Sequence, residues 1–225
     1  MSITAIRETI GLAIQHEEKT HHLASLFESE IDSIHMAVQL PEQNPVGSLV
    51  EFVIAYIKRV PNFLEAARNI TQTAKLEYYA DPILNVAEEF FLKPPEMVSC
   101  HVGLNELMDE AYLAHRLLEE VNDRFMVKSG IPLVSNNMTH SNLIIHNLIG
   151  EPFANQLEEA VQCAVDSLLI KSHVYDSETF KAYLDSHRGD HWKQELKKWP
   201  CLTDELSIHL HFSGLDYDYS DRTYS

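Results

Sequence analysis

Along most of this chain, hydrophobic residues recur at every third or fourth position, which is the spacing of an amphipathic helix. The segment 153–172 shows this most clearly, with apolar residues along one side and charged residues on the other. Between residues 2 and 39 the same spacing predicts one long helix, which the two prolines and the glycine of LPEQNPVG end. We therefore expect an all-α protein of about eight or nine helices.

Capping signals divide this pattern into separate helices. Asn62 lies three residues before Glu65, at the spacing of a capping box, and Asp81 directly precedes Pro82. These signals predict that Pro61 and Pro82 mark the starts of new helices and do not lie inside longer ones. Further helices are expected over residues 102–127, 138–149, 153–172, 177–186 and 191–199.

Near the C-terminus the pattern changes. Only SIHLHF, residues 207–212, alternates like a strand, and the sequence offers this strand no obvious partner. No linker is long enough to separate two domains. We expect a single multi-helical bundle domain over residues 1–213, more broken up than a simple four-helix bundle, and a polar, acidic, tyrosine-rich tail over 214–225.

Charge and cysteine content narrow the function classes. The chain has 34 acidic and 17 basic residues, a formal net charge of −17, which disfavours binding to nucleic acids and to anionic membranes. The three cysteines, Cys100, Cys163 and Cys201, lie far apart, as in proteins of a reducing compartment. No apolar run is long enough to be a signal peptide or a membrane span. The expected location is the cytoplasm.

The helix predicted over 102–127 carries polar residues where core residues belong. At about 100° per residue, His115 and Asn122 fall within its apolar arc, and Glu119 and Tyr112 fall at the edge of that arc. A polar group left unpaired in a core costs about 1–3 kcal/mol, so these side chains need partners. The residues predicted on the opposite, solvated side are Asp109, Arg116, Glu120, Asp123 and Arg124.

Two kinds of partner for these polar side chains are consistent with the sequence. In the first, His115 and Glu119 are metal ligands or a general base with its carboxylate, His146 from the next helix is a further ligand, and Tyr112 and Asn122 help to orient a small molecule. Mixed nitrogen and oxygen ligation suits non-haem iron or manganese best. In the second, the same side chains bond one another and only fix the packing of helices.

Sequence motifs of the common enzyme classes are missing. There is no GxGxxG, GxxxxGK[ST], HExxH or GxSxG. Glu18 and His21 form the one Glu-x-x-His in the chain, whereas ferritin-like di-iron proteins carry two. In size and in its many short helices the chain resembles the haem-oxygenase-like architecture more closely, and this resemblance implies a helical fold without carrying over any site residue.

Two functions therefore remain as hypotheses. One is a metal-dependent or small-ligand protein, such as a non-haem metal oxidoreductase acting through His115 and Glu119. The other is a noncatalytic helical interaction or regulatory protein, which could be a homodimer and whose acidic surface would suit a basic partner.

Overall fold

The computed structural model describes residues 3–73, 77–93, 103–130, 137–168, 178, 181–182, 185 and 200–210. These residues are almost entirely helical, which confirms the expected all-α class. The elements are α1 (Ile3–Thr20), α2 (His22–Ala37), β1 (Val38–Gln39), α3 (Pro45–Thr73), α4 (Glu77–Leu92), α5 (Leu104–Ser129), α6 (Thr139–Ile149), α7 (Phe153–Leu168), α10 (Leu202–Leu206) and β2 (His209–Leu210). The predicted tail, the predicted helix at 191–199 and most of that at 177–186 lie outside the described residues.

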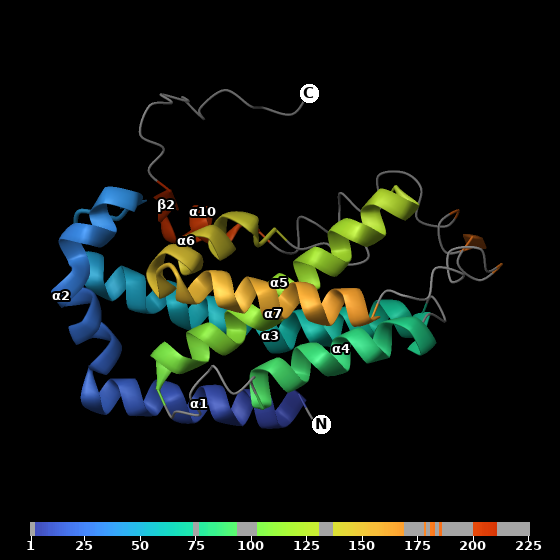
Figure 1. The fold of residues 1–225 in the computed structure, drawn as a ribbon. Coiled ribbons are helices and arrows are strands. Elements are labelled where there is room, and N and C mark those ends of the chain that lie inside the picture. Colours follow the sequence, from blue (N-terminus) through green and yellow to red (C-terminus); the bar gives the residue numbers. More distant parts are fainter. Residues whose placement is uncertain are drawn as a thin grey trace.

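Helix α5 lies at the centre of the bundle and contacts α1, α3, α4, α6 and α7 (Figure 1). Its apolar residues reach most of the way around its circumference, and Leu113, Leu117 and Val121 are buried together with the main apolar face. A helix that is apolar on several sides must be covered on several sides. This composition explains why α5 is the element around which the other helices pack.

The first helical region is broken, whereas the sequence predicts one helix over residues 2–39. His21 adopts the left-handed conformation (φ 51°), and α2 turns away from α1 at this point (Figure 1). The Glu17 carboxylate of α1 accepts hydrogen bonds from the backbone N–H groups of Leu23 (2.9 Å) and Ala24 (3.0 Å). It thereby satisfies two of the free donors at the start of α2. No proline or glycine marks this break in the sequence.

Replacing Glu17 by alanine is expected to lower the free energy of unfolding by about 1–2 kcal/mol, because two buried N–H donors lose their acceptor. Replacing His21 by glycine should raise it by about 1 kcal/mol, because glycine adopts a positive φ without strain. Urea denaturation of both variants measures these changes. Equal stability of Glu17→Ala and the wild type would show that the carboxylate does not cap α2.

Two prolines lie inside helices, so the prediction that they begin new ones is wrong. Pro61 lies within α3 and Pro82 within α4. A proline inside a helix removes one backbone hydrogen bond. In α3 the residues on both sides of Pro61, among them Val60 and Phe63, are fully buried in the core. Burial of a continuous apolar face therefore outweighs the local signal for a helix start.

The predicted strand does have a partner. β2 pairs antiparallel with β1, with Val38 opposite Leu210 and Gln39 opposite His209. This pairing joins the region after α10 to the end of α2. The paired residues are 170 or more positions apart in the sequence. Among the described residues, no helix is long and apolar enough to cross a membrane.

Candidate functional site

His115 lies on α5 at the contact with α3 and is fully buried. Its Nε2 is 3.0 Å from the backbone carbonyl oxygen of Tyr56, to which it donates a hydrogen bond. The imidazole ring packs against the rings of Tyr56, at 4.5 Å between centroids, and Phe63, at 5.5 Å. Burial lowers the pKa of His115 to about 4, although the hydrogen bond to Tyr56 opposes this change. The ring is therefore neutral at pH 7, and its Nδ1 has no hydrogen-bond partner.

Glu119 follows on α5 and is bonded to three side chains. Its carboxylate accepts hydrogen bonds from Arg116, from Thr139 Oγ1 (2.5 Å) and from Asn142 Nδ2 (2.5 Å). Asn142 in turn accepts a hydrogen bond from the Tyr56 hydroxyl at 2.7 Å. These bonds join α5 to α6, and through Asn142 they join both helices to α3.

Tyr112 lies one turn before Arg116 on α5, and its hydroxyl donates a hydrogen bond to Glu158 of α7. Nδ1 of His146 is 2.8 Å from the same hydroxyl oxygen. Because Tyr112 has only one hydroxyl proton, His146 donates to this oxygen from Nδ1. Arg116 binds Glu158 through two nitrogens, Nε at 2.7 Å and Nη2 at 3.0 Å. Such a two-point contact is the strongest geometry for an arginine and a carboxylate.

We call this set of bonded side chains the polar network. It links four helices of the bundle through side chains that, apart from the exposed Thr139, are buried or half-buried. Its members are Tyr56 on α3, Tyr112, Arg116 and Glu119 on α5, Thr139, Asn142 and His146 on α6, and Glu158 on α7.

The electrostatics of the polar network favour the charged forms of Arg116 and Glu158 and the neutral form of Tyr112. Burial alone would raise the pKa of Glu158, but the hydrogen bonds from Arg116 and Tyr112 outweigh it and hold this pKa below its usual range. Burial alone would lower the pKa of Arg116, whereas its bonds to Glu158 and Glu119 raise it. Burial raises the pKa of Tyr112, and the bond to Glu158 raises it further, so the phenol keeps its proton.

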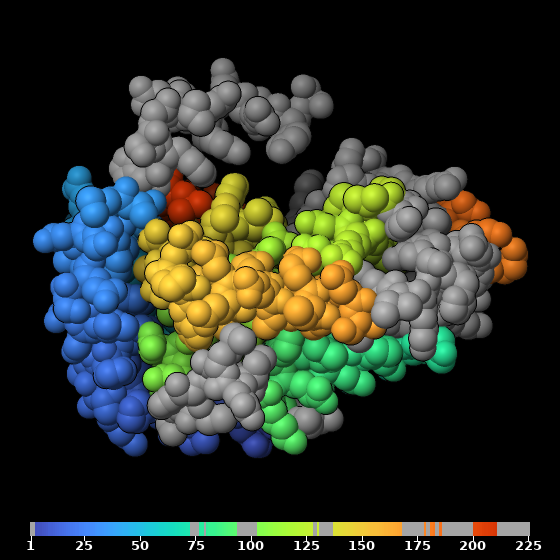
Figure 2. Space-filling view, in the orientation of Figure 1, coloured from blue at the N-terminus to red at the C-terminus, as the bar shows by residue number. Residues whose placement is uncertain are grey.

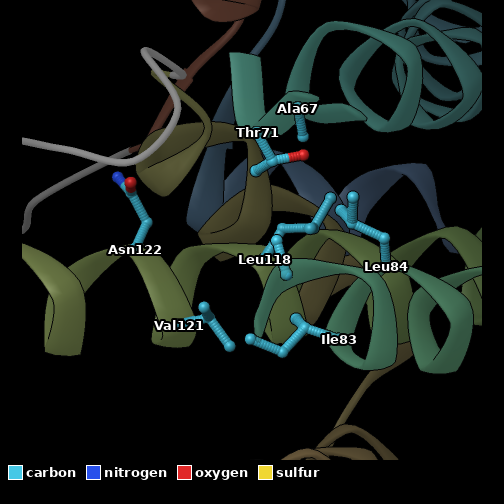
Figure 3. A pocket seen from close by; sticks show the side chains of 8 residues that line it. Ala67, Thr71, Ile83, Leu84, Leu118, Val121 and Asn122 are labelled. Atoms are coloured by element: carbon cyan, nitrogen blue, oxygen red, sulfur yellow. The ribbon is translucent and has the colours of Figure 1, made fainter. Parts of the chain in front are cut away.

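Asn122 is buried on α5. It borders a cavity of about 10 Å³ between α3, α4 and α5 (Figure 3). Figure 3 shows the apolar side chains of Leu118, Leu84 and Ile83 around this space, with Thr71 on α3 above them and Asn122 to one side. Such a volume is at the lower limit for holding about one water molecule, so it does not hold a substrate.

The structure brings together some of the predicted site residues and separates others. Tyr112, Glu119 and His146 belong to the polar network, whereas His115 lies among the aromatic rings at α3 and Asn122 borders the small cavity. Among the described residues, no group of three or more His, Cys, Asp or Glu side chains could hold a metal ion. The three predicted metal ligands, His115, Glu119 and His146, therefore do not form one such cluster.

Several members of the polar network were not expected from the sequence. Arg116 was placed on the solvated side of α5, yet its side chain is only 21% exposed and joins two carboxylates. Glu158 belongs to an ordinary amphipathic helix, and Tyr56 belongs to a hydrophobic run. The residues next to them in the sequence therefore do not indicate that either side chain takes part in a polar network. Asp109 was also placed on the solvated side, but it is half-buried, and burial raises its pKa to about 7.

Comparisons with known proteins reveal no relationship. No family model matches the chain, and neither the curated proteins nor the solved structures include a significant match to it.

Proposed function

We propose that this protein is a noncatalytic helical protein that acts by binding a protein partner. The observation that supports this proposal is the polar network, in which both carboxylates, the buried Glu119 and the half-buried Glu158, are bonded to side chains of the protein itself. Glu119 accepts from Arg116, Thr139 and Asn142, and Glu158 accepts from Arg116 and Tyr112. These contacts give the polar side chains on α5 a structural role.

A catalytic role for Glu119 would require these contacts to break. A metal ion or a substrate proton would compete with Arg116 for the same carboxylate oxygens. Separating a partly buried arginine from its carboxylate is costly, because the charge that remains is poorly solvated. A network that is fully bonded instead fixes one arrangement of its helices. The donor set around Glu119 therefore suits helix packing better than it suits metal binding.

The outer face of α2 supports the choice of partner. Its inner face is buried through Leu23 and Phe27, while Glu28, Glu30 and Asp32 are exposed. The helix carries no lysine or arginine. In the space-filling view, α2 forms one side of the molecule (Figure 2). Two copies of such a face would repel each other, so it favours a partner with a basic surface over a homodimer through α2.

Charge reversal on α2 tests this proposal. We expect the double variant Glu28→Lys/Asp32→Lys to lose a partner that the wild-type protein retains from extract of its own cells, because the attraction is mainly electrostatic. The control is Glu89→Lys/Glu159→Lys, which makes the same change in charge at exposed positions of α4 and α7. The measurement is quantitative mass spectrometry of the retained proteins. Equal retention by the α2 variant and the control would contradict the role of this face.

A second candidate, a non-haem metal oxidoreductase, is favoured by one observation, which is the buried and unpartnered Nδ1 of His115. Under the main proposal, elemental analysis of the untagged protein should find far less than about one equivalent of iron or manganese per chain. About one equivalent that disappears in His115→Ala, with a folded variant by circular dichroism, would replace the main proposal with this one.

A further inference from the structure

A surface groove of about 290 Å³ runs between α1 and α3, and none of its lining residues belongs to the polar network. From α1 it is lined by residues at helical spacing, which places them on one face of the helix. Arg7 and Ile14, at the two limits of this face, are seven residues apart, or about 10 Å at 1.5 Å per residue. The lining residues are Arg7, Ile10, Gly11 and Ile14 of α1 and Lys58, Pro61 and Asn62 of α3.

Gly11 keeps the middle of this groove open. A Cβ atom added to Gly11 would meet nothing within 4 Å, and its φ is not positive, so neither packing nor backbone conformation requires glycine here. Glycine inside a helix destabilises it relative to alanine. The opposite wall contains Pro61, a compact side chain in the interior of α3. The fold therefore does not require glycine at this position, and a longer side chain here would extend into the groove.

The charge of the groove is opposite to that of the protein. The chain has twice as many acidic as basic residues, yet both ionisable residues that line the groove, Arg7 and Lys58, are basic. Arg7 pairs with Glu65 at 2.9 Å, in a contact that is about half exposed to solvent. Within the described part of the chain, no carboxylate pairs with Lys58. An anionic ligand could therefore bind the ammonium group of Lys58 without displacing a carboxylate of the described residues.

We propose that the α1–α3 groove binds an aliphatic carboxylate, with its carboxylate at Lys58 or Arg7 and its carbon chain across Gly11 between Ile10 and Pro61. The apolar middle disfavours a strongly polar ligand such as a nucleotide, and the basic residues disfavour an uncharged hydrocarbon. Octanoate, which has one carboxylate and a short aliphatic chain, combines the two chemistries of this lining and is the probe used below. This inference concerns a site separate from α2 and does not depend on the function proposed above.

Titration of the isotope-labelled protein with octanoate, followed by two-dimensional amide NMR, tests the site. We expect saturable shifts of the amide signals around Gly11 and Pro61, with a Kd below about 1 mM. Gly11→Leu should weaken binding at least about tenfold, because its side chain fills the hollow. A Cβ atom at this position meets nothing within 4 Å, so the substitution begins in open space, and circular dichroism checks that the variant folds. Gly11→Ala serves as the matched control, because it removes the glycine and fills much less of the groove.

Two further comparisons test the assigned chemistry. Lys58→Gln, an exposed substitution, should weaken octanoate binding, and octanol should bind the wild type more weakly than octanoate does. Equal binding of octanol, or unchanged affinity in Lys58→Gln, would overturn the anionic ligand. A lack of saturable shifts, shifts confined to other helices, or full affinity in Gly11→Leu would overturn the site itself.

Discussion

Replacing Arg116 by alanine is expected to lower the free energy of unfolding by about 3 kcal/mol. The wild-type guanidinium bonds Glu119 and Glu158, whose side chains are only 9% and 25% exposed. Without it, two poorly solvated carboxylates lie near each other with no neutralising charge. The pKa of Glu158 is held below 4.5 in the folded protein, so this stabilisation is present above pH 4.5 and fades as the pH falls through the lowered pKa. Urea denaturation at pH 7 and pH 3 measures both effects.

Arg124 provides a matched control on the same helix. It also joins α5 to α7, through Asp166 at 2.9 Å, and it pairs with Glu120 of its own helix at 3.1 Å, but the Asp166 side chain is 70% exposed. Exposed ion pairs contribute about 0–1 kcal/mol, so Arg124→Ala should have a small effect. If Arg116→Ala destabilised the protein no more than Arg124→Ala, the polar network would not be a stabilising feature, and the proposal that rests on it would fail.

His115 is expected to make the protein sensitive to acid between about pH 6.5 and pH 4. Burial lowers its folded-state pKa to about 4, whereas the ordinary value is 6.5, so in this range the unfolded chain binds a proton that the folded chain does not. The stabilisation from neutral His115 is fully present above pH 6.5 and is lost as the pH falls to about 4. At about 1.36 kcal/mol for each pKa unit, the loss amounts to roughly 3 kcal/mol.

The variant His115→Gln cannot titrate in this range and isolates the effect. We expect the free energy of unfolding of the wild type to fall by about 3 kcal/mol more than that of the variant between pH 7 and pH 4. His140→Gln, an exposed histidine substitution on α6, should keep the wild-type pH dependence. If the free energy of unfolding had the same pH dependence in the wild type and in His115→Gln, protonation of the imidazole would cost no stability. The side chain of His115 would then not be excluded from solvent.

Together these two experiments address the polar residues on the apolar side of α5. If the polar network has a structural role, removing the charge of Arg116 should lower the free energy of unfolding strongly and leave the metal content unchanged. A catalytic His115–Glu119 pair would instead predict that substitutions alter a bound ligand. In the structure Glu119 contacts Arg116, Thr139 and Asn142, whereas His115 contacts Tyr56 and Phe63. The two residues that the sequence analysis predicts to act as a pair therefore have different partners.

The site could be predicted only in part. Helical spacing correctly identified His115, Glu119 and Asn122 as buried, and all three are less than a tenth exposed. It placed Tyr112 at the edge of the apolar arc, whereas this residue is almost fully buried. It did not identify Arg116, whose long side chain starts at the edge of α5 and reaches across to Glu158. Helical position fixes where a Cα lies, but the reach of a long side chain and the helix that it meets depend on tertiary packing.

The sequence by itself determined the all-α class and the helix expected over residues 102–127, which is α5 (Leu104–Ser129) in the structure, because both follow from local apolar spacing. Only the tertiary structure decided that α1 and α2 separate at His21, that α3 continues through Pro61, and that β2 pairs with β1. For α3 and for the β1–β2 pair, distant contacts outweigh the local preference, whereas the start of α2 is capped by Glu17 of the preceding helix. The polar network is of the same kind, since its bonds form between side chains up to 86 positions apart, which no local pattern in the sequence records.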